Sequence, residues 1–219
     1  QTGGGRLCGP EFASLGLEGK RLDEVVEYAG VKHNEYQEYI YTSLLADPGV
    51  LTSKELQPFL KSKTTSFLNG IGITNAKSPL PGNFDMLDST FGDFQKLSFE
   101  AKEIFGQLES LTKSYNRERS VLFYNQLADL KQKALSISSF NESLAAASAI
   151  SIAEHSFLYW ENNLAKWMEL FKSVGQNDVF GKGSPCDIQP KHIAGADVAG
   201  GVRGGVAGTF LGAAVGAFA

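Results

Sequence analysis

The sequence predicts an all-α protein, an antiparallel bundle of about four to five helices followed by a C-terminal glycine-zipper helix. Apolar residues recur at steps of three and four over long stretches, as on one face of a helix. No stretch alternates with a period of two for long enough to indicate a sheet. With 219 residues, of which 42% are hydrophobic, the chain can form one large core without a metal or a covalent staple.

The first two helices are expected between residues 22 and 68. The turn Asp47-Pro48-Gly49 ends the first helix, and a capping box at residues 52–55 predicts the second from about Ser53 to Leu68. The stripe of the first helix consists of Leu22, Val25, Ala29, His33, Tyr36, Ile40 and Leu44.

A long helical pattern runs from Leu97 to Ile137 and falters at residues 116–119. One bent helix and two stacked helices both fit it. A second capping box at residues 139–142 then begins the helix with the most regular pattern in the chain. Its alternating steps of four and three predict lengthwise packing against a near-antiparallel neighbour. The residues of this stripe are Ala146, Ile150, Ala153, Phe157, Trp160, Leu164, Trp167 and Phe171.

These patterns divide the chain into four regions. We expect an irregular Gly-rich N-terminal arm at residues 1–18, a helical bundle at 19–174, a polar loop at 175–193 and a glycine-zipper segment at 194–219.

The composition excludes some partners and suggests a compartment. A net charge of −4 argues against a nucleic-acid partner, which would require a basic face. Cys8 and Cys186 sit in loop-like sequence outside any CxxC motif, which favours one disulfide formed in an oxidising compartment over two free thiols. The start at Gln1, with no charged and apolar leader, is expected for a mature exported form or a trimmed chain.

The C-terminal segment places glycine at helical spacing. Each glycine disfavours a helix by roughly 1 kcal/mol relative to alanine, so a helix here requires close packing that offsets this cost. A row without side chains beside an apolar ridge lets another helix approach closely. The glycines of this predicted interface are Gly200, Gly204, Gly208, Gly212 and Gly216.

Three interpretations of the segment remain open. The first is a flexible tail, and the second is a zipper helix docked on the rest of the fold. The third is a helix that joins other copies or enters a bilayer. Residues 204–219 carry no charge, but as a helix they would span only about 24 Å of a hydrocarbon core roughly 30 Å thick.

No motif in the chain specifies a reaction. His33 lies on the apolar stripe of the first helix, where we expect a core histidine hydrogen-bonded by a neighbour in preference to a catalytic or metal-binding histidine. The Glu154-His155 pair lacks further ligands at metal spacing. Residues 175–182 lack the Ser or Thr of a phosphate-binding loop. We therefore predict no catalytic residue, no metal site and no cofactor, and an enzyme is the third choice of function.

Three short motifs carry a family resemblance. They are residues 31–36 (VKHNEY), residues 156–160 (SFLYW) and residues 196–200 (ADVAG) before the Gly/Ala tail. Together they resemble uncharacterised secreted helical proteins of bacteria with a Gly-rich C-terminus, and the resemblance implies export. The tail by itself is similar to the glycine-zipper segments of membrane-active peptides and two-component bacteriocins.

The expected function is that of an exported, non-enzymatic structural or interaction protein. It would be secreted or reside in the bacterial cell envelope. Its C-terminal helix would pack against other copies, a partner protein or a membrane. The alternative is a membrane-permeabilising toxin whose bundle sequesters the tail until contact.

Overall fold

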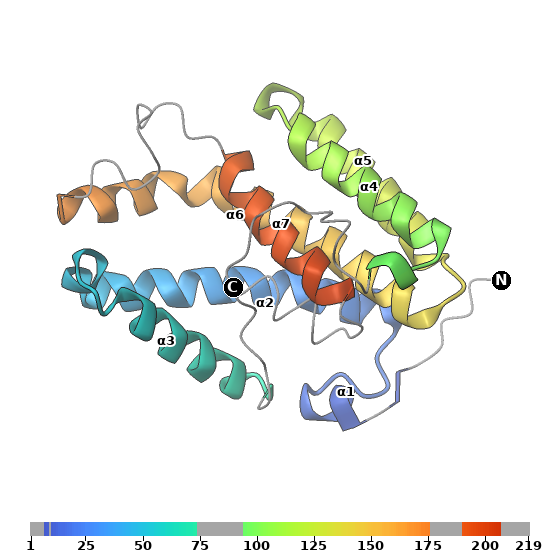
Figure 1. Ribbon diagram of the computed structural model, residues 1–219, viewed down its shortest axis with the longest axis horizontal. Helices are drawn as coiled ribbons and strands as arrows, with labels where there is room; N and C mark the ends of the chain where they lie inside the picture. The colour runs from blue at the N-terminus through green and yellow to red at the C-terminus, as the bar shows by residue number, and fades with distance from the viewer. Residues whose placement is uncertain (1–6, 9, 74–93, 176–189, 207–219) are drawn as a thin grey trace.

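The computed structural model, shown in Figure 1, describes residues 7–8, 10–73, 94–175 and 190–206. These residues form α-helices, three short 3-10 helices and connecting turns, with no strand among them, which confirms the predicted all-α class. The α-helices are α1 (Pro10–Ser14), α2 (Leu22–Ala46), α3 (Leu56–Gly70), α4 (Phe99–Ser114), α5 (Ser120–Leu135), α6 (Phe140–Ser173) and α7 (Pro190–Val206). The 3-10 helices are Pro48–Thr52, Phe94–Lys96 and Arg117–Arg119.

Helix α6 is the element against which four of the other α-helices pack. It contacts α2, α4, α5 and α7, and every side chain from residue 143 to residue 153 is buried. A helix that is apolar or small on all sides is typical of a fully enclosed position. The hydroxyls of Ser143, Ser148 and Ser151 find no partner among the described residues. These serines therefore serve as small side chains in packing rather than as polar contacts.

The neighbours of α6 do not all run in the same direction. Asn34 of α2 bonds the carbonyl of His155, and Tyr41 packs on Trp167, so α2 runs parallel to α6 (Figure 1). Helix α5 runs antiparallel, because Tyr124 reaches Glu161 whereas Lys131 reaches Glu154. The expected near-antiparallel seam is therefore only part of the packing of α6. Hydrophobic periodicity identifies the face that is buried, but not the direction of the helix that covers it.

The two predicted capping boxes have different outcomes. The first is wrong: the Thr52 hydroxyl donates to the carbonyl of Gly49 within a 3-10 helix, and α3 begins later, at Leu56. The second is half right: the Ser139 hydroxyl accepts from the backbone N–H of Glu142. The carboxylate of Glu142 turns instead to Ser98, the N-cap of α4, and accepts from its N–H at 2.9 Å and its hydroxyl at 2.6 Å.

The long pattern from residue 97 to residue 137 forms two helices, as the second of the two interpretations had it. Helices α4 and α5 lie side by side and antiparallel, joined through the 3-10 helix at Arg117–Arg119 (Figure 1). The break lies at the faltering segment, where the Asn116 side chain accepts from the N–H of Glu118. A local side-chain bond of this kind competes with helix continuation.

The N-terminal arm contains more order than its composition suggested. It forms the short helix α1 and adds apolar side chains to the core. Gly72 packs against it with a φ of +88°, and a Cβ there would lie 2.3 Å from the carbonyl oxygen of Ser14. This close approach requires glycine. The buried side chains of the arm are Leu7, Phe12, Leu15 and Leu17.

The described residues cover the predicted disulfide and the predicted membrane contact only in part. Cys8 is exposed near the start of the chain, and Cys186 lies outside the described residues, so their disulfide stays a prediction. Of the helices that the structure describes, none combines the length and the apolar character that crossing a bilayer requires.

Candidate functional site

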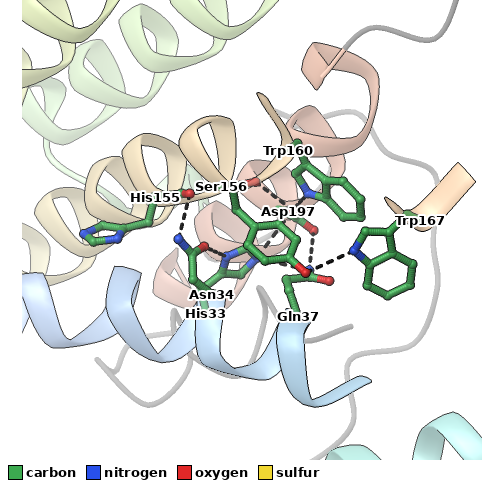
Figure 2. A network of polar contacts seen from close by, with 9 residues as sticks. His33, Asn34, Gln37, His155, Ser156, Trp160, Trp167 and Asp197 are labelled. Atoms are coloured by element: carbon green, nitrogen blue, oxygen red, sulfur yellow. Dashed lines mark hydrogen bonds and ion pairs between the residues drawn. The ribbon is translucent and has the colours of Figure 1, made fainter. Parts of the chain in front are cut away.

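A polar cluster that joins three helices centres on Asp197 of α7. Its Oδ2 accepts hydrogen bonds from the hydroxyl of Ser156 at 2.7 Å and from the indole Nε1 of Trp160 at 2.9 Å, both on α6. Its Oδ1 accepts a longer bond from the amide of Gln37 on α2, at 3.4 Å. Figure 2 shows how these side chains converge from three helices. We call this set, together with His33, the Asp197 cluster.

Small residues of α7 bring Asp197 to this depth. Ala194, Val198 and Ala199 are almost completely buried, and α7 packs chiefly along α6. Because these side chains are short, the helix lies close enough for an aspartate to reach α6. The Asp197 side chain is only 13% exposed. A carboxylate this enclosed needs donors to replace water, and the cluster supplies them.

His33 of α2 lies beside Asp197 in the cluster and is fully buried. Its Nδ1 lies 3.1 Å from Oδ1 of Asn34, whose amide nitrogen donates to the carbonyl of His155. That second bond orients the Asn34 amide, so we assign the Nδ1 proton of His33 as the donor to Asn34. Its Nε2 lies 3.4 Å from both Gln37 and Asp197. The expectation of a core histidine bonded by a neighbour is confirmed.

The order of groups in the Asp197 cluster matters for its chemistry. In a nucleophilic triad, histidine stands between the hydroxyl and the carboxylate, takes the proton of the hydroxyl and is oriented by the carboxylate. Here the carboxylate stands between Ser156 and His33, and the Ser156 hydroxyl donates to it directly. This arrangement suits holding three helices together rather than activating a serine.

A hydrogen bond to α3 extends the contacts around the cluster. The hydroxyls of Tyr36 on α2 and Thr64 on α3 lie 2.7 Å apart. Burial raises the pKa of the Tyr36 hydroxyl. The negative charge of Asp197 also raises this pKa, whereas the hydrogen bond with Thr64 lowers it, and the net effect is an increase. Tyr36 thus remains a neutral hydroxyl that joins α2 to α3.

A separate polar group joins α2 to the second half of α6. The indole of Trp167 donates to the Tyr159 hydroxyl, which donates to Glu38 of α2. Lys166 also binds Glu38, and its ammonium lies 4.4 Å from the centre of the Tyr41 ring. Burial raises the pKa of the Tyr159 hydroxyl. Together with the Asp197 cluster, these contacts fix the register of α2 along α6.

The predicted zipper glycines are only partly described. Gly200 and Gly204 lie in α7, whereas Gly208, Gly212 and Gly216 fall outside the described residues. No group of three metal-ligating side chains that could hold an ion occurs in the described part of the chain.

Sequence reasoning missed the role of Asp197. A signal was present: Asp197 is the only acidic residue from position 188 to the C-terminus, among small and apolar neighbours. A lone carboxylate on such a helix indicates either exposure or a prepared set of donors. Helical periodicity cannot say which, because the donors come from α2 and α6.

No protein-family model, curated protein or solved structure matches this chain.

Proposed function

We propose that the protein is a helical interaction protein, exported and non-enzymatic, whose C-terminal glycine-zipper helix packs closely against a helix of another molecule. In this proposal the described helices form a bundle that holds the start of that helix in a fixed place. The partner is another copy of the chain or another protein.

The observation that carries the proposal is the anchoring of α7 by Asp197. A flexible tail would not need a buried carboxylate with donors on two other helices. The anchor lies directly before Gly200 and Gly204, so it would fix the direction of α7 at the first two glycines of the row. Glycines in register on a helix so oriented are suited to close helix contact.

Export is proposed on sequence grounds. An oxidising compartment would allow a Cys8–Cys186 disulfide, which would tie the N-terminal arm to the segment before α7. Closing a loop of this size would add about 4–5 kcal/mol in the loop-entropy model.

The experiment is a comparison of mass in solution. We expect the native chain to form assemblies, measured by light scattering over a range of concentrations. The double substitution Gly208→Leu and Gly212→Leu should leave a monomer, because the leucines keep the helices apart. An unchanged assembly in this variant would refute the proposal.

A matched control separates close packing from a general effect of leucine. Gly70 ends α3, and a Cβ there would meet no atom within 4 Å. Gly70→Leu should therefore leave the size of the assembly in solution unchanged. Dye release from liposomes tests the alternative: leakage caused by the native chain and lost in the double variant would favour a membrane-permeabilising function over ours.

A further inference from the structure

A groove between α4 and α5 lies outside the Asp197 cluster and opens to solvent. It has a volume of about 570 Å³, and a neighbouring hollow of about 260 Å³ continues it along the same two helices. Leu111 and Leu130 contribute apolar surface, and Gly106 of α4 also lines the groove. A Cβ at Gly106 would meet no atom within 4 Å.

The rim of this groove is mainly acidic. Glu103 on α4 and Asp129 on α5 are exposed beside it, with Lys133 as the basic residue of the lining. Glu100 lines the neighbouring hollow and adds a third carboxylate. An occupant with a positive charge and a narrow helical face would match both the charge and the shape of the groove.

The C-terminal segment of the chain has these properties. Arg203 is the only charged residue from position 198 to the end. As a helix, the row of glycines from Gly204 onward would offer a narrow face, with Val206 and Phe210 beside it. As a helix, residues 203–219 would be about 25 Å long, and the groove from Glu100 to Leu111 spans roughly 16 Å of α4.

The position of α7 favours a second molecule as the source of this segment. Gly195 of α7 lies beside the buried Thr112, on the inner side of α4. The groove lies on the solvent side of α4 and α5. This part of α7 therefore lies on the opposite side of α4 from the groove of its own molecule, whereas the groove of a neighbouring molecule is open to residues 203–219.

We propose that the α4–α5 groove is the docking site for residues 203–219 of a second copy of this chain. This inference rests on the proposed function and names its partner. The contact is head-to-tail, since one copy supplies the segment and the other the groove. Such contacts continue from copy to copy, forming rings or open chains rather than ending at a symmetric dimer.

Complementary full-length variants test the inference. Gly106→Leu fills the groove and leaves the segment native. Gly208→Leu with Gly212→Leu blocks the segment and leaves the groove native. Each variant alone should be a monomer by light scattering, with native helicity by circular dichroism. An equimolar mixture should form a 1:1 dimer, because one native segment then meets one native groove.

The charge of the rim gives a second readout. In the copy that supplies the groove, Glu103→Lys should weaken the 1:1 dimer at least tenfold. Glu118→Lys makes the same charge change at an exposed position in the turn between α4 and α5, so the dimer should persist. Equal weakening by both would show that overall charge, not this groove, governs association, and would overturn the inference.

The outcomes distinguish this inference from the proposed function. If the glycine variant is monomeric but Gly106→Leu assembles like the native chain, the segment packs elsewhere, and only the groove is refuted. If the two variants are mixed and form no 1:1 dimer, again only the groove is refuted. If the glycine variant assembles normally, both the proposed function and the inference fall. A native chain that is monomeric at every concentration also refutes both.

Discussion

At the scale of single residues, Asp197 shows how one charge can determine where a helix lies. Its carboxylate is nearly enclosed and accepts from Ser156, Trp160 and Gln37. Moving α7 away would leave those donors without their acceptor. Because an unsatisfied buried group costs about 1–3 kcal/mol, the cluster disfavours other positions of α7 more than a purely apolar contact would.

Gly30 on α2 marks the closest approach to α6 that the structure records at a glycine. A Cβ there would lie 2.3 Å from Cδ2 of His155 and 2.7 Å from the backbone oxygen of Ser151. The imidazole can turn, but the carbonyl belongs to the α6 backbone. We expect Gly30→Ala to destabilise the protein by about 2 kcal/mol, since overpacking outweighs the roughly 1 kcal/mol gain in helix propensity. Urea unfolding measures the change.

Gly106 provides the control for this prediction. It also lies inside a helix, but open space surrounds the added Cβ. Gly106→Ala should therefore stabilise the protein by up to about 1 kcal/mol. If stability changed in the same direction in both variants, the contact between α2 and α6 would not determine the effect of Gly30→Ala.

At the scale of elements, Glu142 joins the starts of two helices that are far apart in sequence. Ser139 caps α6, and the Glu142 carboxylate accepts from the N–H and the hydroxyl of Ser98, which caps α4. We expect Glu142→Ala to destabilise the protein by about 1–2 kcal/mol, since the backbone N–H of Ser98 loses its acceptor. Thermal unfolding measures the loss.

Glu100 distinguishes this contact from a general effect of helix-end charge. It is exposed in the first turn of α4, where a carboxylate gains only about 0.3–1 kcal/mol from the helix dipole. Glu100→Ala should thus cost less than Glu142→Ala. A loss at least as large as that of Glu142→Ala would refute a special role for the link to Ser98.

At the scale of the whole molecule, a charged group joins α2, α5 and α6 at the surface. Glu27 of α2 lies 2.6 Å from Nε2 of His155 on α6 and 3.6 Å from Nζ of Lys131 on α5. Lys131 also reaches Glu154 at 2.6 Å. Partial burial raises the pKa of Glu27, but the contacts with His155 and Lys131 outweigh it and hold the pKa below its usual 4.5.

This lowered pKa implies a dependence of stability on pH. A carboxyl whose pKa is lower in the folded state stabilises the fold above its unfolded pKa, and this contribution is lost as the pH falls through the folded pKa. Glu27→Gln should reduce stability at pH 7 by under about 1 kcal/mol, because the group is half-exposed. It should also flatten the loss of stability below about pH 4.5. Urea unfolding across this range measures both.

Glu18 is an exposed carboxylate suited as the control. Glu18→Gln should leave the slope below pH 4.5 as in the native chain. Should Glu27→Gln behave in the same way, the charged group would not contribute to acid unfolding.

The sequence by itself determined where the long helices lie and which of their faces are buried, but it did not predict the short helix α1. Helix α2 begins at Leu22 as expected, the break between α4 and α5 falls at the faltering segment, and His33 is buried with a neighbour as its partner. These features depend on residues close together in the chain, whose spacing reports periodicity and local hydrogen bonding.

Only the tertiary structure decided how distant segments combine. The parallel course of α2 and α6, the link from Glu142 to Ser98 and the donors around Asp197 each join residues more than 35 positions apart. The same carboxylate suits a solvated surface or a buried anchor, and the same apolar stripe accepts a parallel or an antiparallel neighbour. Which one occurs depends on the groups that folding brings opposite, and helical spacing carries no record of them.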